Sequence, residues 1–256
     1  MLKIILAILF VLSNSVLFAD MAKNQKIPYC DTIGYKLCQE RIFDCIIIKE
    51  KIIQEKHRKK IIKKNVPETW EELFPNEEYR TFIMKLNRLN IPLKKGMPIA
   101  LPKEKNKQLA DFSPFLPWIN PPKEKILIFN PKLLAWAAYL PNGKLLRWGP
   151  ALGGMDRCPD TWRKCRTIVG IWRIVKKGDD DSRSHIYPIG CGRKNNPCAP
   201  MPWFSQFEIH GYGFHGSSKM VGKHASHGCV RVFTDDAKWI NQNFAEIGTK
   251  TITLSY

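Results

Sequence analysis

The chain has 256 residues and a formal net charge of +18 at pH 7, with 44% hydrophobic and 25% charged residues. These proportions are those of a folded protein and exclude a disordered or fibrous chain, and the length accommodates one domain of common size with a smaller one. The excess of positive charge favours anionic partners such as acidic polymers, acidic peptides or lipid surfaces, although a solubilising role is the alternative for most individual lysines.

The first 19 residues have the form of a secretory signal peptide. A basic start at Lys3 precedes the apolar stretch from Ile4 to Leu12, and Ala19 offers a small residue for cleavage. The apolar stretch is too short to span a bilayer comfortably, and an uncleaved anchor is the alternative. We therefore expect export to the periplasm or cell envelope of a Gram-negative bacterium, no transmembrane domain after cleavage, and no nucleic-acid partner.

Eight cysteines suit an oxidising compartment. Cys158 and Cys165 are seven residues apart, as are Cys191 and Cys198, and both pairs lie in segments whose Pro and Gly residues allow the chain to turn back. We predict a disulfide within each pair. If Cys229 stays free, three cysteines remain, and one of them must be free or bonded to another molecule. These three are Cys30, Cys38 and Cys45.

Residues 20–57 form a cysteine-containing segment whose pattern is ambiguous. Residues 38–56 are compatible with a helix, but their paired isoleucines suit strands as well. The basic run that begins at Lys56 is most simply a solvated surface, with contact to a polyanion as the alternative.

Residues 58–103 carry a clearer order of elements. We expect a strand at residues 60–63, a helix capped by Thr69, a second helix at residues 77–90 with one apolar stripe, and a closing strand at residues 97–101. This order is similar to that of a LysM glycan-binding module. It departs from that family at the first turn, where Pro67-Glu68-Thr69 stands in place of Gly-Asp-Thr. Glycan binding and simple packing against the neighbouring domain both stay open.

A proline-rich linker at residues 104–122 leads to a domain at residues 123–256 built from short apolar segments. Pro-Asn-Gly-Lys at residues 141–144 predicts a hairpin, and Thr234 is expected to cap one late helix that ends near Phe244. We therefore predict a mostly-β domain, sandwich-like or barrel-like, after the small strand–helix–helix–strand module. The expected strands lie at residues 126–129, 133–140, 145–148, 167–175, 203–207, 209–214 and 249–254.

Residues 210–231 contain four of the six histidines, five of the sixteen glycines and one cysteine. A cysteine nucleophile needs a base that takes its proton, and glycines let backbone N–H groups approach the reacting atom. This run therefore favours nucleophilic catalysis. The alternatives are a glycine-rich hairpin with surface histidines and a metal site at His224, His227 and Cys229. Structural zinc usually takes ligands from two separate clusters, and the run has no matching CxxC, so we expect no metal.

The two halves of this run have a recognisable form. Phe214-His215-Gly216-Ser217 is followed by Val221-Gly222 and then by Ser226-His227-Gly228-Cys229-Val230-Arg231. This arrangement resembles the signature of the YkuD-like family of L,D-transpeptidase catalytic domains. The resemblance extends over residues 123–256, where Trp148-Gly149-Pro150 also falls where that family places a similar segment.

The resemblance implies a role for each residue of the motif. Cys229 is the nucleophile and His215 its general base. His210 is the rival base, although its odd offset along a strand directs it to the opposite face. The carbonyl of Gly216 orients the imidazole, and the backbone N–H groups of Gly228 and Cys229 form an oxyanion hole.

Three further residues have supporting roles in this interpretation. His227 is a secondary donor beside the oxyanion hole. Arg231 and Ser226 bind substrate, with a bidentate contact between the Arg231 guanidinium and a carboxylate, and bracing of the loop is the alternative for Arg231. The resemblance implies no organic cofactor and no metal.

The implied reaction is a two-step acyl transfer on peptidoglycan. Cys229 attacks the carbonyl of the L-centred diamino acid in a tetrapeptide stem, releases D-alanine, and passes the acyl group from its thioester to an amine. An amine of a second stem gives a 3→3 cross-link, and a lysine of an outer-membrane lipoprotein gives a wall-tethered lipoprotein. The expected partners are peptide stems, with glycan and a lipoprotein as further candidates. The alternatives are an L,D-carboxypeptidase or hydrolase on the same scaffold, and a non-catalytic wall-binding protein.

Overall fold

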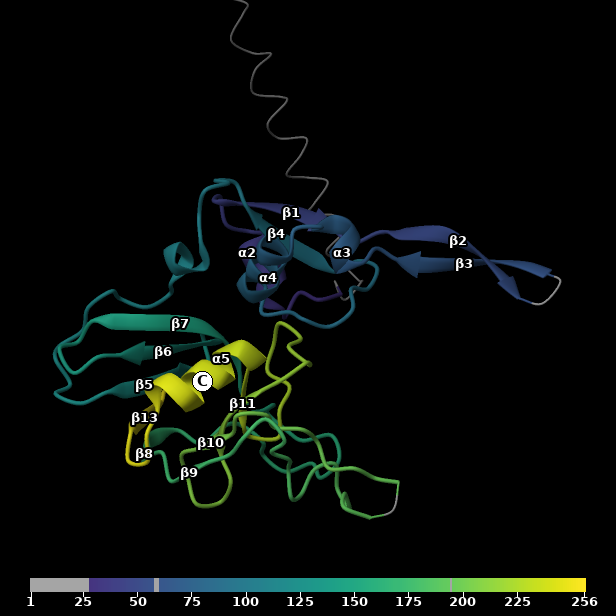
Figure 1. The fold of residues 1–256 in the computed structure, drawn as a ribbon. Helices are drawn as coiled ribbons and strands as arrows, with labels where there is room; N and C mark the ends of the chain where they lie inside the picture. The colour runs from purple at the N-terminus through teal and green to yellow at the C-terminus, as the bar shows by residue number, and fades with distance from the viewer. Residues whose placement is uncertain (1–27, 58–59, 194) are drawn as a thin grey trace, which may run out of the picture.

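A computed structural model describes residues 28–57, 60–193 and 195–256 (Figure 1). The predicted signal peptide at residues 1–19 lies outside these described residues. Within them, no helix combines the length and the apolar character that crossing a bilayer requires.

The N-terminal module has its own small sheet and core. Strand β1 pairs antiparallel with β4, in a register that sets Phe43 opposite Pro102 and Ile47 opposite Pro98. Helices α3 and α4 follow between these strands in the sequence, and the core joins residues of all these elements, including Ile83 and Ile99. The elements in chain order are α2 (Ile33–Leu37), β1 (Phe43–Ile47), β2 (Glu50–His57), β3 (Lys60–Pro67), α3 (Trp70–Leu73), α4 (Glu77–Leu86) and β4 (Pro98–Pro102).

The strand that opens the strand–helix–helix–strand order differs from the one we expected. Residues 60–63 are a strand, but they belong to β3, which pairs only with β2 in a hairpin that extends from the module (Figure 1). The partner of β4 is β1, so residues 38–56 contain strands and are not a helix. The two segments have similar isoleucine patterns in the sequence, and they differ in how they pack in the tertiary structure. Ile48, directly after β1, is buried in the module core, whereas Ile61 is 68% exposed.

The predicted helices of the module are present with their caps. Thr69 and Glu72 form a capping box at the start of α3, because each side chain accepts a hydrogen bond from the other's backbone N–H. Asn76 caps α4. That helix ends at Leu86, earlier than the expected residue 90, and Arg88 then has a φ of +54°, which turns the chain out of the helix.

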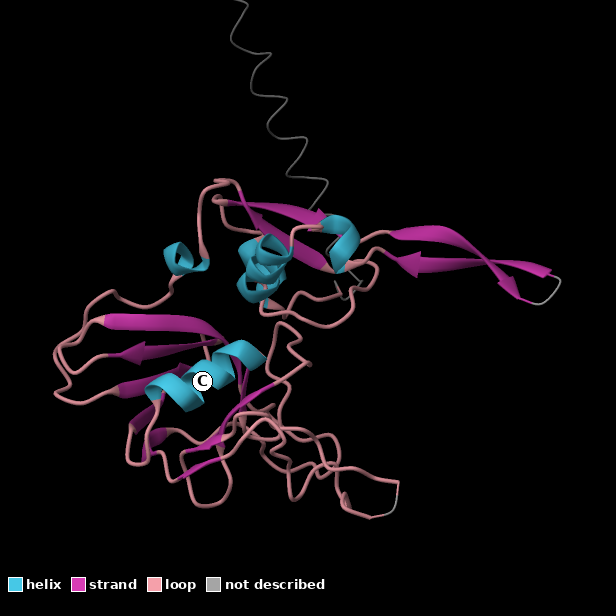
Figure 2. Ribbon diagram, viewed as in Figure 1, coloured by secondary structure: helices cyan, strands magenta, loops and turns pink. Residues whose placement is uncertain are grey.

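The C-terminal domain is built on one nine-stranded sheet, as the mostly-β prediction required. The strands lie in the order β8-β13-β5-β6-β7-β12-β11-β10-β9, and most of the chain between β9 and β11 is loop (Figure 2). They are β5 (Ile126–Asn130), β6 (Ala135–Tyr139), β7 (Leu145–Leu152), β8 (Gly170–Arg173), β9 (Lys176–Lys177), β10 (Ser205–Gln206), β11 (Gly213–Gly216), β12 (Val230–Val232) and β13 (Lys250–Thr253).

The late helix packs on the face of this sheet. It consists of α5 (Thr234–Trp239) and a short π-helix, η2 (Ile240–Phe244). Ala237, Ile240 and Phe244 join the main core with apolar residues of β5, β6 and β12. The predicted cap differs by one residue, since Thr234 is the first helical residue and Phe233 precedes it without a side-chain cap.

The linker is partly docked between the two domains. Its helix η1 (Leu109–Phe112) brings the Phe112 ring within 5.5 Å of the Phe43 ring of the module, and Phe115 joins a cluster on the C-terminal sheet. Leu116 and Trp118 of the same linker are largely exposed.

Both predicted disulfides are present, Cys158–Cys165 and Cys191–Cys198. A third joins Cys38 to Cys45, again seven residues apart. Cys30 and Cys229 are the free cysteines among the described residues. The odd cysteine that the sequence left unassigned is therefore Cys30.

Candidate active site

The two halves of the motif meet on neighbouring parallel strands. Strand β11 carries His215 and β12 carries Arg231, and these two residues stand directly opposite each other in the register. Paired residues of a parallel ladder point to the same face, and residues two apart on one strand do so as well. Cys229 directly precedes β12 and is two residues from Arg231, so strand periodicity directs it to the same face as His215.

The environment of His215 holds it as a neutral base. The residue is 6% exposed, and Nδ1 lies 2.8 Å from the carbonyl oxygen of Gly216. Because a carbonyl only accepts, Nδ1 carries the proton and Nε2 is left as the acceptor. Burial, reinforced by the nearby Arg231, lowers the pKa of His215 to about 4. The imidazole is consequently neutral at pH 7, the form that takes a proton.

The position of Gly216 has no room for a side chain. A Cβ at this position would stand 2.9 Å from Thr234 Cα and 3.1 Å from a ring carbon of Pro202. Its N–H donates to the Pro202 carbonyl at 2.8 Å. The glycine thus lets β11 approach the start of α5 and fixes the carbonyl that orients His215.

Cys229 is a protonated thiol in the resting site. Burial raises its pKa to about 11, against an opposing effect from Arg231. Its Sγ lies 3.5 Å from the carbonyl oxygen of Gly211. The thiol therefore needs a base at the moment it reacts.

A tight turn presents the thiol. Ser226 Oγ accepts the Gly228 N–H at 3.1 Å and donates to the Cys229 carbonyl. Gly228 has a φ of +131°, and a Cβ there would stand 2.7 Å from the Tyr212 ring. Ser226 thus lies inside the turn, 2% exposed, rather than on the surface where a substrate would bind. The Gly228 N–H already has Ser226 as its acceptor, so Cys229 N–H is the donor left beside the thiol.

The His227 side chain contacts two residues of other loops, Asp160 and Tyr187. Its Nε2 lies 3.1 Å from Asp160 Oδ2, and its ring packs on Tyr187 with centroids 4.2 Å apart. Asp160 belongs to the loop closed by the Cys158–Cys165 disulfide. Asp160, Tyr187 and Tyr212 are site residues that sequence reasoning missed. Only Tyr212 carries a signal in the sequence, its place inside the motif, because the other two come from distant loops.

Arg231 is a half-buried guanidinium beside the thiol. Burial lowers its pKa, against an opposing effect of Cys229, and in the described part of the chain no carboxylate lies within ion-pair distance of it. Such a group favours an anion that arrives from outside.

The rival base lies at the surface. The His210 ring pairs with Glu208 in the turn before β11, and its side chain is 77% exposed. That turn interrupts the strand we expected at residues 209–214, of which only the part from Gly213 belongs to β11.

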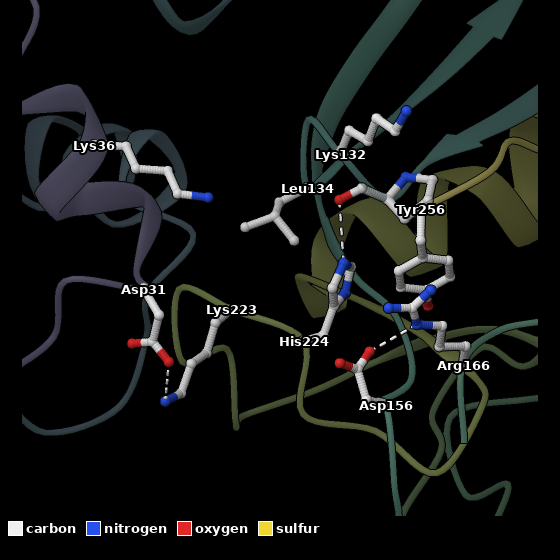
Figure 3. Close-up of a pocket in the computed structure, with 10 residues that line it drawn as sticks. Asp31, Lys36, Lys132, Leu134, Asp156, Arg166, Lys223, His224 and Tyr256 are labelled. Carbon is white, nitrogen blue, oxygen red and sulfur yellow. Dashed lines mark hydrogen bonds and ion pairs between the residues drawn. The ribbon is translucent and has the colours of Figure 1, made fainter. Parts of the chain in front are cut away.

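His224 has a structural role instead of the metal-ligand role weighed above. Its Nε2 lies 3.1 Å from the Pro131 carbonyl (Figure 3). Its Nδ1 accepts the Gly153 N–H at 2.9 Å, so both ring nitrogens are engaged. Burial lowers its pKa to about 4. The ring borders a pocket of about 270 Å³ where α2 of the module meets the C-terminal domain. The set His224, His227 and Cys229 is therefore not assembled as a metal site.

A family model described as the L,D-transpeptidase catalytic domain (YkuD) matches residues 124–252. The sequence matches no curated protein.

Among solved structures, the fold is similar to an L,D-transpeptidase from Xylanimonas cellulosilytica, with a TM-score of 0.45, 22% identity, and coverage of 54% of this chain and 64% of that one. For an L,D-transpeptidase from Mycobacterium smegmatis the values are 0.41, 18%, 52% and 59%. For L,D-transpeptidase 3 from Mycobacterium tuberculosis with a faropenem-derived adduct they are 0.42, 17%, 51% and 60%. The chain thus spans less than two thirds of the length of these structures.

Proposed function

Because the chain belongs to the L,D-transpeptidase catalytic domain family, we propose that it is a cysteine-dependent L,D-transpeptidase acting on peptidoglycan tetrapeptide stems. The observation that supports this proposal is the parallel pairing of β11 with β12, which sets His215 opposite Arg231 and has Cys229 directly before β12. The chemistry below is what these groups can perform there.

The first step is acylation of the cysteine. His215 Nε2 takes the thiol proton as Cys229 Sγ attacks the carbonyl of the L-centred diamino acid. The two pKa values, about 4 and about 11, are far apart, so proton transfer accompanies the attack and no thiolate forms beforehand. The N–H of Cys229 donates to the oxyanion. When the tetrahedral intermediate collapses, the imidazolium returns the proton to the departing amine of D-alanine and a thioester remains.

The second step transfers the acyl group. An acceptor amine attacks the thioester carbonyl, His215 takes its proton, and the thiol is regenerated. An amine of another stem yields a 3→3 cross-link, and a lipoprotein lysine yields an anchored lipoprotein. Water in place of the amine makes the enzyme an L,D-carboxypeptidase.

Arg231 supplies the recognition of the substrate in this scheme. Peptide stems carry carboxylates, and a guanidinium binds one through two parallel hydrogen bonds. The missing carboxylate partner within the described residues supports this assignment over bracing of the loop.

The setting of the protein follows from the same proposal. Three disulfides fit an exported protein, and the substrate lies in the cell envelope. We assign it to the Gram-negative periplasm, with residues 1–19 as the signal for export. The N-terminal module, similar in the order of its elements to LysM, would then bind glycan or support its neighbour.

The test is mass spectrometry of the protein after incubation with disaccharide-tetrapeptide. We expect a thioester adduct and 3→3 dimers with the unmodified protein. Cys229→Ala should yield neither while unfolding at the same temperature. The matched control is Cys30→Ala, which removes the other free thiol and should behave like the unmodified protein.

The products separate the alternatives. An adduct that resolves to tripeptide alone supports the carboxypeptidase. Cross-linking by Cys229→Ala, or a complete lack of adduct on a protein whose Cys229 is demonstrably reduced, would refute the mechanism and leave a non-catalytic wall-binding protein.

A further inference from the structure

The loop between the base and the nucleophile rests on the N-terminal module. We call residues 217–223 the connecting loop, because it joins β11 with His215 to the turn that presents Cys229. In Figure 1 its yellow-green trace extends from β11 to the module. Gly222 N–H donates to the Arg88 carbonyl at 2.9 Å, and Ile33 N–H donates to the Gly222 carbonyl at 2.8 Å.

Asn90 makes the most specific of these contacts. Its Nδ2 donates to the Ser217 carbonyl at 2.8 Å, and its Oδ1 accepts the Met220 N–H at 2.8 Å. Its own N–H also donates to the Met220 carbonyl at 3.0 Å. The side chain thus uses both its donor and its acceptor to hold two points of the connecting loop, three residues apart.

Apolar packing reinforces the hydrogen bonds between Asn90 and the connecting loop. Met220 is fully buried in a cluster with Leu152 and Phe233 of the C-terminal domain, and the module adds Met84 and Ile33 to the same cluster. Leu89 and Val221 form an antiparallel bridge beside it. The module therefore holds the connecting loop both by hydrogen bonds and by apolar packing.

The points at which the module holds the connecting loop are close in sequence to the base and to the nucleophile. Ser217 is two residues after His215, and its own N–H donates to the Val232 carbonyl at 2.9 Å, which continues the pairing of β11 with β12. Gly222 is four residues before Ser226, where the nucleophile turn begins. Holding the loop at these points limits how far the two strand ends can separate.

We propose that Asn90 is a positioning residue of the active site, and that the N-terminal module thereby completes the catalytic geometry of the neighbouring domain. It acts through Ser217 and Met220 on the relative placement of His215 and Cys229. The proposal rests on the proposed function for its turnover readout. A second readout, the reactivity of the Cys229 thiol, is independent of the substrate.

The experiment compares Asn90→Ala with Asn76→Ala in the full chain, both in a Cys30→Ala background. Asn76 is a matched control because its side chain caps α4 by accepting the Tyr79 N–H, within the same module but away from the connecting loop. The first readout is kcat and KM with tetrapeptide. The second is the pH profile of alkylation by iodoacetamide, which reports the pKa of the Cys229 thiol.

For Asn90→Ala we expect kcat to fall about tenfold or more with KM changed by less than about twofold, since a small misplacement of reacting groups is costly. Releasing the connecting loop loosens the turn that follows it and holds Cys229, so the alkylation profile should move to lower pH because burial no longer raises the pKa of Cys229 as strongly. Asn76→Ala should lower the melting temperature and leave both kcat and the profile unchanged.

Asn90→Asp is the second variant, because it keeps the size and the acceptor but sets a carboxylate against the Ser217 carbonyl. We expect changes in the same direction as for Asn90→Ala. An unchanged kcat and profile in both Asn90 variants would overturn the proposal. So would losses that match the fraction of unfolded protein, or equal effects from Asn76→Ala. If the unmodified protein forms no adduct with tetrapeptide, the proposed function fails, while the alkylation profiles still decide the role of Asn90.

Discussion

Burial displaces the pKa values of several residues around the motif, and the direction differs with the chemistry of each group. It disfavours the charged form, so the pKa of His215 and of His224 falls to about 4 while that of Cys229 rises to about 11. The carbonyls of Gly216 and Pro131 oppose the decrease at the two histidines without cancelling it. At the residue scale the base His215 and the nucleophile Cys229 are therefore both uncharged at rest, beside the guanidinium of Arg231.

Keeping His215 neutral makes the fold sensitive to acid. Its pKa is about 4 when folded and 6.5 as the unperturbed value, so below pH 6.5 the unfolded chain takes up the proton first and stability decreases. The contribution is fully present above pH 6.5 and is lost progressively down to about pH 4, by up to about 3 kcal/mol at the rate of roughly 1.4 kcal/mol per pKa unit.

Thermal unfolding at pH 7, 6, 5 and 4 measures this dependence. We expect His215→Gln to flatten the decrease between pH 6.5 and 4, with His224→Gln acting in the same sense. His185→Gln is the control, since that side chain is exposed, and it should keep the full decrease. An identical slope in all variants would show that other groups cause the acid sensitivity.

At the scale of elements, α4 of the module is tied to α5 of the C-terminal domain by charge. Lys85 Nζ lies 2.9 Å from Asp236 and 2.5 Å from Asp235, and Arg147 reaches Asp236 at 2.6 Å. Lys85 and Asp236 are both buried. Because burial raises the pKa of Asp236 and the two cations lower it, the carboxylate depends on these partners.

Lys85→Met should reveal how strongly this contact matters. Removing one partner of a buried ion pair leaves an incompletely compensated carboxylate, so we expect a loss of about 3 kcal/mol or more in the free energy of unfolding. Lys51→Met is the matched control, because Lys51 pairs with Glu72 at an exposed site and such pairs contribute at most about 1 kcal/mol. Denaturant unfolding gives both values, and equal losses would contradict the assignment.

At the scale of the whole molecule, the hairpin β2–β3 stands apart from both cores. It pairs only with itself, and Ile52 and Ile61 are exposed on it. Its base is linked to the module by the exposed pairs Lys51–Glu72 and Glu50–Lys95. The core clusters of the described residues include no residue of this hairpin.

Replacing residues 51–66 by a short glycine-containing turn tests this separation. We expect the free energy of unfolding to change by less than about 1 kcal/mol, because of the two pairs at its base only the exposed Lys51–Glu72 is lost. The kcat with tetrapeptide should stay the same, since the connecting loop keeps its contacts with Arg88 and Asn90. A large loss of stability or of kcat would place the hairpin within the catalytic unit. Calorimetry and the tetrapeptide assay measure the two quantities.

Local patterns in the sequence determined much of this protein. The capping residues at Thr69, the hairpin at residues 141–144 and the apolar strands around residues 126–148 depend on neighbours along the chain, and they are present. The seven-residue spacing predicted two disulfides, and the same spacing would have predicted the third, Cys38–Cys45. The motif with His215 and Cys229 is local in the same sense, because one loop joins its halves.

Only the tertiary structure decided which segments pair across long distances. Isoleucine-rich segments near residues 46 and 61 look alike in sequence, but burial against α4 and β4 selects β1 as the partner strand. Asp160 at His227 and Asn90 at the connecting loop lie 67 and 127 to 130 residues from their partners. No short-range pattern encodes such contacts, because their free energy is gained only when separate elements pack together.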